Sequence, residues 1–348
     1  MKCMNLQGTG VETKGNLDAI KAGIFGVVVG DALGVPVEFT SRSERESDPV
    51  TDMREYGTHS QPKGTWSDDS SMALASLDSI IQNGGINYDD MMERFRDWKI
   101  NGNYTPHGRV FDVGITCSRA IAQYRPGVKA IECGGDGERD NGNGSLMRIM
   151  PVSLYDALEE GYWNDTFIEE AAENSHGASS LTHRHPRSKM ACLMHTSICH
   201  ELIYRGDESI YMALWKGIHG TFDFYERRAE SLPWFDESFQ SEIQADAYGR
   251  LRDLEAFMNL PDSEIKSSGY VVHTLEAAVW CLLNSKSYAE CVLKAVNLGD
   301  DTDTVGAVAG GLAGLAYGYE NIPKDWLGVI VKKDWIMKLC EDFAYIMS

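Results

Sequence analysis

Two short acidic segments contain the residue types best suited to chemistry. Ser67-Asp68-Asp69 precedes an apolar helical pattern, and Asp301-Thr302-Asp303-Thr304 precedes a helix of small residues. Carboxylates this close in sequence repel one another unless a helix start, solvent or a hard cation compensates them. Because aspartate and threonine are ordinary N-cap residues, the second segment taken alone favours a capped, solvated helix start.

The presence of both segments changes that interpretation. If the two helix starts meet in space, four carboxylates and two hydroxyls converge. Such oxygen donors suit Mg²⁺ or Mn²⁺, and two ions ~4 Å apart would polarise a sugar and orient a nucleophilic water. The sequence therefore indicates a two-metal carboxylate site.

Two other motifs fit the second segment poorly. An EF-hand starting at Asp301 would place Val305 at an oxygen-ligand position and Leu312 where the bidentate glutamate belongs. The Asp-x-Asp-x-Val pattern of a phosphatase superfamily matches Asp301–Val305, but that motif follows a buried strand in an α/β fold. No alternation of strands and helices is visible here.

Helical periodicity dominates the elements that must position these groups, so the fold class is all-α. Leu17 to Val28 has helical spacing, and the pattern stops at the Gly30-Asp31 and Gly34-x-Pro36 punctuation. Ser67 precedes a helix that ends at Asn83-Gly84. Met91, Met92, Phe95 and Trp98 form another helical face. Further helical runs are expected at about 189–204, 270–284, 287–297 and 304–317.

The chain is expected to form one domain over residues 15–348, preceded by a flexible tail at 1–14. Residues 221–268 are charged and aromatic, which indicates a variable insertion. Two glycine-rich or turn-rich stretches, Cys133–Gly144 and Thr182–Pro186, are loops of the kind that often hold binding groups.

Composition narrows the function classes further. The 348 residues have a net charge of −20, which argues against bulk binding of nucleic acid. The eight cysteines form no C-x-x-C pair and the N-terminus lacks an apolar signal region, so we expect a cytoplasmic, reducing location. The apolar stretches Ala22–Gly30 and Val305–Tyr317 are shorter than the roughly 20 residues of a membrane span, so no membrane association is expected.

Several motifs in a fixed order resemble the ADP-ribosylglycohydrolase family, most of all its branch containing the bacterial dinitrogenase reductase-activating glycohydrolase. The resemblance extends from about Ala22 to Gly318. It implies an all-helical fold with a cleft holding two Mg²⁺ or Mn²⁺ ions, and hydrolysis of the bond between C1″ of ADP-ribose and an acceptor on a protein or small conjugate. The segments that carry it are GVVVGDALGVPVEF, GTWSDDSSMAL, HGRVFDVGIT, NGNGSLMRIMPVSL, LTHRHPRSK, SGYVVHTLEAAVWCL and NLGDDTDTVGAVAGGLAG.

The resemblance also implies a set of metal ligands. Many relatives have threonine where this chain has Ser67, whose hydroxyl can still coordinate a cation. Asp300 stands where relatives often have glycine, so it is left outside the ligand set. The implied ligands are Ser67, Asp68, Asp69, Asp301, Asp303 and Thr304.

Two further carboxylates match catalytic positions of the family. Cleavage through an oxocarbenium-like transition state needs a carboxylate that activates water or stabilises positive charge. Asp112 matches a site aspartate of the nitrogenase-regulating branch, and Glu38 matches a catalytic glutamate of other branches; either could be the base. The structural alternatives are a solvent-facing turn for Glu38 and an N-cap of a helix over 113–124 for Asp112, which has no acidic neighbour in the sequence.

The substrate-binding residues implied by the resemblance lie in the glycine-rich loop 141–148 and beyond it. Glycines there let backbone amides approach a pyrophosphate, although a plain helix-capping turn is the alternative. A lone histidine is more often structural, and an aromatic residue that opens a helix more often belongs to the core. The candidates are Asn143, Gly144, Met147, His183 and Tyr270.

Two other function classes stay open. One is a non-catalytic relative that binds ADP-ribose or has a structural role, and the other is a metal-dependent nucleotide phosphohydrolase. The acceptor also stays open among arginine, serine, a nucleobase and a metabolite, with the resemblance favouring arginine.

Overall fold

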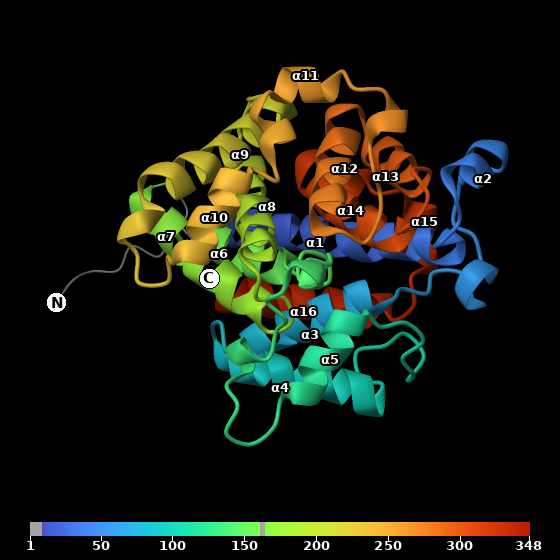
Figure 1. The fold of residues 1–348 in the computed structure, drawn as a ribbon. Coiled ribbons are helices and arrows are strands. Elements are labelled where there is room, and N and C mark those ends of the chain that lie inside the picture. Colours follow the sequence, from blue (N-terminus) through green and yellow to red (C-terminus); the bar gives the residue numbers. More distant parts are fainter. Residues whose placement is uncertain (1–8, 161–163) are drawn as a thin grey trace.

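The computed structural model describes residues 9–160 and 164–348, and within these ranges it contains α-helices, short 3₁₀ helices and isolated bridges but no β-strand. The predicted all-α class and single helical domain are confirmed (Figure 1). The helices are α1 (Thr9–Gly34), α2 (Arg42–Ser47), α3 (Asp68–Asn83), α4 (Tyr88–Asn101), α5 (Ile115–Gln123), α6 (Met150–Glu160), α7 (Asp165–Ser180), α8 (Pro186–Tyr204), α9 (Ile210–Arg227), α10 (Glu237–Ala245), α11 (Leu254–Met258), α12 (Val271–Leu283), α13 (Tyr288–Val296), α14 (Thr302–Tyr317), α15 (Lys324–Val329) and α16 (Lys333–Ile346).

The first helix, α1, is the centre of the core. It runs through the middle of the molecule beside α14, with α3 and α16 on one side and α12 and α13 on the other (Figure 1). Phe25 and Val29 are fully buried within it. Asn16–Val37 is long and apolar enough for a membrane span by length and composition, but 94% of its most apolar window is buried inside the protein. This apolar stretch is longer than the sequence analysis expected.

The expected bounds of this helix are correct at one of the two stop signals and wrong elsewhere. The helix ends at Gly34, where the Gly34-x-Pro36 signal lies. The Gly30-Asp31 pair does not stop it, because the carboxylate of Asp31 accepts hydrogen bonds from the backbone amides of Ser67 and Ser70 and stays inside. At the other end α1 begins at Thr9, so part of the segment expected as a flexible tail is helical. The remainder of that expected tail, residues 1–8, lies outside the described residues.

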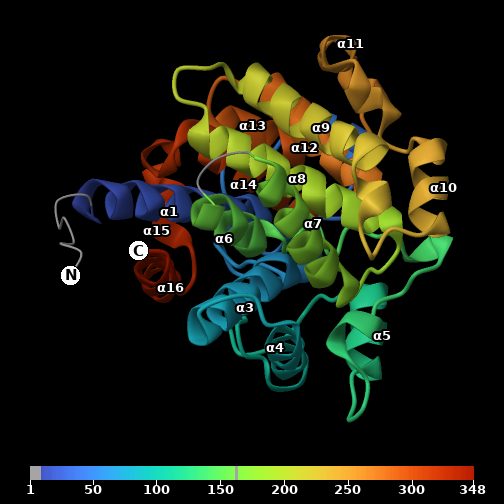
Figure 2. The ribbon, with the colours of Figure 1, turned by 90° about the vertical axis from the view of Figure 1, so that its left-hand side faces the viewer.

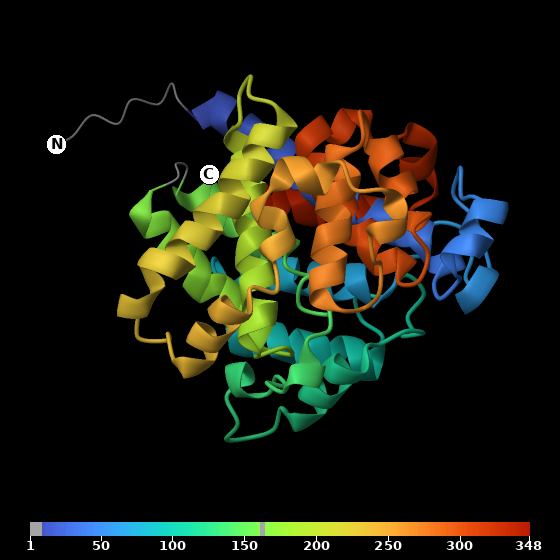
Figure 3. The ribbon, with the colours of Figure 1, turned by 45° about the horizontal axis from the view of Figure 1, so that its top comes forward.

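Most other predicted helices are found within a few residues of their expected bounds. Ser67 caps α3 by accepting a hydrogen bond from the amide of Asp69, and Gly84 closes the helix in the left-handed conformation. The apolar face predicted in α4 is buried. Residues 221–268 form the end of α9 together with α10 and α11 on the outer side of the bundle (Figures 2 and 3). Their description as a variable insertion stays a prediction.

Close packing of α1 against α14 brings two parts of the site together. A Cβ on Gly30 would lie 2.0 Å from the carbonyl oxygen of Gly306, and a Cβ on Gly306 would lie 2.6 Å from the carbonyl oxygen of Gly30. Only glycine permits this approach of the two backbones. The contact places Asp31 of α1 next to the acidic start of α14.

We expect Gly306→Ala to lower the free energy of unfolding by at least the 1–3 kcal/mol typical of an overpacked core, because the added methyl group would overlap backbone that cannot rotate away. Urea denaturation monitored by circular dichroism measures the change. Gly328→Ala in α15 is the matched control: its Cβ has no atom within 4 Å, so a neutral or slightly stabilising effect is expected. Equal stability of both variants would contradict the close approach.

Candidate active site and metal centre

The two acidic helix starts meet, as the sequence predicted. Asp69 and Asp303 are both 1% exposed, and the hydroxyl of Thr304 donates to Asp69 Oδ2 at 3.4 Å. The Ser67 hydroxyl also donates to Asp69 Oδ2, at 2.9 Å. Asp68 lies at the edge of the cluster, where its Oδ2 accepts a hydrogen bond from the amide of Gly114 at 3.3 Å.

Asp31 joins this cluster, and sequence reasoning missed it. It is fully buried, and its carboxylate accepts hydrogen bonds from the backbone amides of Ser67 and Ser70. One donor atom from each of Asp31, Asp69 and Asp303 lies within 4.8 Å of the others. The signal was available: an aspartate on the buried face of an apolar helix needs a polar partner or a cation.

The electrostatics of the cluster favour a cation. Burial raises the pKa of Asp69 and of Asp303 well above the ordinary aspartate value, and neighbouring carboxylates raise both further. Burial also raises the pKa of Asp31 to about 7, although hydrogen bonds from Ser70 and Ser67 oppose the shift. Asp69 Oδ1 is buried without a hydrogen-bond partner. Buried, mutually repelling carboxylates with an unsatisfied oxygen fit hard divalent cations.

The carboxylate of Asp301 is oriented toward the site instead of capping α14. It occupies the N-cap position but makes no side-chain cap hydrogen bond. Its Oδ2 accepts a hydrogen bond of 2.9 Å from the side-chain amide of Asn143. Asn143 is fixed by two further bonds, from its side-chain amide to the Thr274 hydroxyl and from its backbone amide to the Gly269 carbonyl. A capping role therefore does not explain the carboxylate of Asp301. Asp300, which was left outside the ligand set, is exposed.

Glu38 and Asp112 face the same cleft. Glu38 is 4% exposed, so it is not a solvent-facing turn residue. Asp112 does not cap α5, which begins at Ile115 with Gly114 as its N-cap. Asp112 also has acidic neighbours in space, because its charge raises the pKa of both Glu38 and Asp68. Burial is the main cause of the raised pKa of Glu38.

His59 is a second residue that sequence reasoning missed. Its Nε2 contacts Glu38 Oε2, and this hydrogen bond is the main cause of its raised pKa. One donor atom from each of Glu38, His59 and Asp112 lies within 4.8 Å of the others. No motif marked this histidine, because it reaches Glu38 only when η1 (Val35–Val37) and η2 (Gly57–His59) fold against each other.

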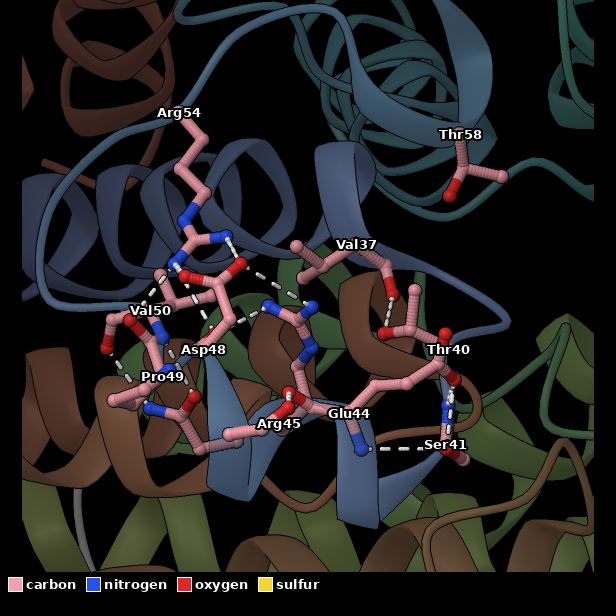
Figure 4. A network of polar contacts seen from close by, with 12 residues as sticks. Val37, Thr40, Ser41, Glu44, Arg45, Asp48, Pro49, Val50, Arg54 and Thr58 are labelled. Carbon is pink, nitrogen blue, oxygen red and sulfur yellow. Dashed lines mark hydrogen bonds and ion pairs between the residues drawn. The ribbon is translucent and has the colours of Figure 1, made fainter.

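The turn that presents Glu38 is held in place by polar contacts. The hydroxyl of Thr58 donates to the Glu38 carbonyl at 2.7 Å. Beyond the turn, Ser41 and Glu44 form a capping box at the start of α2, and Arg54 pairs with Asp48 (Figure 4). Glu38 is therefore presented by an anchored segment.

Some of these groups line one cavity of about 350 Å³, whereas Ser67, Asp69 and Asp303 lie behind its wall and are buried. Its wall includes catalytic and metal candidates together with four of the five predicted substrate-binding residues. They are Glu38, Asp68, Asp112, Asn143, Gly144, Met147, His183, Asp301 and Thr304. A larger groove of about 550 Å³ on α9 contains none of the candidate residues.

The glycine-rich loop packs directly against His183. A Cβ on Gly144 would lie 2.6 Å from Cys117 Sγ and 2.8 Å from His183 Cε1, so glycine is required there. Burial and the positive charge of Arg148 lower the pKa of His183 to about 3, so the imidazole is neutral. Its Nδ1 is 2.9 Å from the Thr182 hydroxyl, which fixes the ring.

Tyr270 is the predicted binding residue that does not line the cavity. It precedes α12 as its N-cap residue and pairs with Gly142 in an isolated bridge, next to the cavity wall. Arg187 Nη1 donates to its hydroxyl at 2.9 Å, and Arg187 also pairs with the buried Glu242 of α10. Residues 221–268 thus contribute to the support of Tyr270.

The fold and the cleft define a helical hydrolase scaffold with an acidic, cation-compatible centre. A profile of the ADP-ribosylglycohydrolase family matches residues 12–347, and the chain belongs to this family. It is therefore a glycohydrolase that acts on ADP-ribose linkages to acceptors.

Three relatives illustrate the similarity. ADP-ribosylarginine hydrolase Tri1 of Serratia proteamaculans (strain 568) is 30% identical over 332 residues, which cover 95% of this chain and 80% of the relative. ADP-ribosyl-[dinitrogen reductase] glycohydrolase of Rhodospirillum rubrum is 28% identical over 326 residues, or 91% of each chain. A solved structure described as an ADP-ribosylglycohydrolase-related protein complex aligns with a TM-score of 0.74 at 27% identity, covering 96% of this chain and 100% of the other.

We expect metal-free protein to lose stability as pH rises from about 4 to 7. In this window the folded state keeps protons on carboxyl groups such as Asp31, whose pKa is raised to about 7, while the unfolded chain has released them near the model value of 3.8. The folded state then binds more protons than the unfolded state, so the free energy of unfolding falls with pH. Bound Mg²⁺ replaces those protons and should stabilise the fold by about 2.7 kcal/mol at 100 times its Kd.

Thermal melts with chelator and with saturating Mg²⁺ test this expectation. A range from about pH 4.5 to 7.5 covers most of the window in which the folded and unfolded states bind different numbers of protons. The two melting curves should diverge as pH rises. Curves that coincide at every pH would contradict a cation site at the acidic cluster.

Proposed function

We propose that this glycohydrolase uses two divalent cations, Mg²⁺ or Mn²⁺, and that its substrate is ADP-ribosylated arginine on a protein or a small conjugate. The observation that carries the proposal is the position of Glu38 and Asp112 in the same cavity as the two acidic helix starts. A nucleophilic water, its base and the cations would then meet at one sugar carbon.

The choice of arginine rests on the relatives. Two proteins similar along most of this chain are named an ADP-ribosylarginine hydrolase and an ADP-ribosyl-[dinitrogen reductase] glycohydrolase. The guanidinium group of the arginine acceptor is cationic. This chain has a net charge of −20, and its negative field attracts a cationic substrate.

The residues would hold the cations and divide the work in the following way. The predicted ligands Ser67, Asp68, Asp69, Asp301, Asp303 and Thr304, joined by Asp31, offer the oxygen donors, and cations held there would supply charge stabilisation and orient water. One of Glu38 and Asp112 accepts a proton from the water whose oxygen bonds to C1″, and the other carboxylate stabilises positive charge at that carbon. The bond from C1″ to the arginine nitrogen breaks, the guanidine leaves as a neutral group, and it then takes up the proton.

The glycine-rich loop completes the binding site in this proposal. Neutral His183 and the backbone at Gly142 and Gly144 form the wall next to Asn143. Neutral imidazole and backbone amides bind a pyrophosphate by donating hydrogen bonds, without adding a buried charge that would need its own partner.

The test is hydrolysis of matched substrates. We would incubate the protein with arginine-linked and serine-linked ADP-ribosyl peptides, with chelator, Mg²⁺ or Mn²⁺, and measure free ADP-ribose by chromatography. Release from the arginine-linked peptide only with metal is the expected result. Release from the serine-linked peptide alone would contradict the acceptor, and chelator-insensitive release would contradict the role of the cations.

Two outcomes correspond to the other function classes. Inorganic phosphate instead of free ADP-ribose would identify a nucleotide phosphohydrolase. Tight ADP-ribose binding without release from any conjugate would identify a binding protein. Both would overturn the proposed activity.

We also propose a cytoplasmic location without bulk binding of nucleic acid or membranes. The cysteines that the structure describes are all buried and unpaired, which suits a reducing compartment. Fractionation of cells producing the tagged chain tests the location.

A further inference from the structure

A third group of metal-binding side chains lies beside the acidic cluster and differs from it in chemistry. One donor atom each of Glu38, His59 and Asp112 lies within 4.8 Å of the other two. The other two groups, one of Asp31, Asp69 and Asp303 and one of Glu38, Asp301 and Asp303, offer only carboxylate oxygens. This group shares Glu38 with the second of them and adds an imidazole nitrogen. Imidazole is a good ligand for Zn²⁺ and a poor one for Mg²⁺.

The three side chains come from separate segments of the chain, and contacts around His59 and Glu38 fix their positions. The His59 ring contacts two aromatic rings in tilted arrangements, with centroid distances of 6.0 Å to Phe39 and 5.3 Å to Phe111. These contacts restrict the imidazole while its Nε2 contacts Glu38 Oε2. Thr58, next to His59, bonds the Glu38 carbonyl, so the histidine and the glutamate are fixed relative to each other.

The charges also favour a cation at this point. Burial and the charge of Asp112 disfavour ionisation of Glu38, whereas the hydrogen bond with His59 favours it. Both carboxylates line the cavity, so an ion can reach them from solvent. Tetrahedral Zn²⁺ with ligands at about 2.0–2.2 Å needs donor atoms about 3.4 Å apart, and the three donor atoms here lie within 4.8 Å of one another.

We propose that Glu38, His59 and Asp112 form a Zn²⁺ site with three protein ligands and an open position toward the cavity. This inference extends the proposed function, because it gives the same cleft an inhibitory ion. Zn²⁺ bound there occupies both candidate catalytic carboxylates. Turnover should therefore fall while Mg²⁺ stays bound at Asp31, Asp69 and Asp303, the all-oxygen group that shares no residue with the Zn²⁺ site.

Calorimetric titration of Zn²⁺ into protein saturated with Mg²⁺ tests the site directly. The native protein should bind one Zn²⁺ in addition to Mg²⁺. His59→Gln keeps a hydrogen-bond donor for Glu38 but removes the imidazole, and it should weaken Zn²⁺ binding by at least tenfold, as should Asp112→Asn. The matched control is His107→Gln, an exposed histidine whose ring bonds the Thr65 hydroxyl outside the group.

Turnover measurements separate this site from displacement of Mg²⁺. Inhibition by Zn²⁺ should persist at saturating Mg²⁺ and should be relieved in His59→Gln when each variant is compared with its own Zn²⁺-free rate. Unchanged Zn²⁺ affinity in His59→Gln would overturn the proposal, as would inhibition that Mg²⁺ reverses in full. Zn²⁺ binding that needs His59 in a protein with no hydrolase activity would support the site and overturn the proposed function alone.

Discussion

Asp112→Asn should lower kcat by about 10²-fold or more, the scale of a general acid-base group, while the affinities for Mg²⁺ and ADP-ribose change little. Asp112 faces the cavity but belongs to neither all-oxygen donor group, so its replacement removes a reacting carboxylate and leaves those donors in place. Loss of its charge also lessens the repulsion felt by Glu38 and Asp68.

Single-turnover kinetics on an arginine-linked peptide would give the rate, and calorimetry would give the two affinities. Asp207→Asn, at an exposed position, is the matched control and should behave as the native protein. Full activity in Asp112→Asn would assign the base to Glu38, and Glu38→Gln would then show the large loss of kcat.

Asp303→Asn should weaken Mg²⁺ binding by about 10²-fold, and ADP-ribose binding and turnover should fall with it. Within the described residues, Asp303 offers a donor atom to both all-oxygen groups, one with Asp31 and Asp69 and the other with Glu38 and Asp301. A single neutral substitution there affects both.

The same substitution should change stability in opposite directions with and without metal. Asp303 is buried among like charges that raise its pKa, so asparagine removes repulsion and the metal-free protein should melt at a higher temperature. With saturating Mg²⁺ the variant should gain less than the native protein. Asp300→Asn, the exposed neighbouring position, should change neither value. Native Mg²⁺ affinity in Asp303→Asn would show that the second acidic segment does not hold the cation.

The sequence determined the helical class and most helix positions because both follow from local patterns. Ser67 and Gly84 mark the ends of α3 by side-chain capping and by left-handed backbone conformation, which need no distant partner. The two acidic segments were likewise legible, because like charges adjacent in sequence need compensation in any fold.

One expected helix stop, Gly30-Asp31 in α1, was wrong, because the helix continues through it. Asp31 resembles a helix terminator next to Gly30, but it lies inside a continuous helix because amides of Ser67 and Ser70, from α3 and its N-cap, satisfy its carboxylate. The apolar pattern around Asp31 indicates that it needs a partner, but the partner is 36 residues away, so no local rule could identify it.

The tertiary structure alone decided which groups share the cleft. Asp112 has no acidic neighbour in the sequence, yet the loop before α5 places it beside Glu38, Asp68 and His59. His59 carries no motif, and its contact with Glu38 exists only because η1 and η2 pack together. Residue types and their local order specify the helices and the acidic segments. The distances among side chains of different helices depend on tertiary packing. At Gly30 and Gly306, for example, the absence of a side chain lets the backbones of α1 and α14 approach closely.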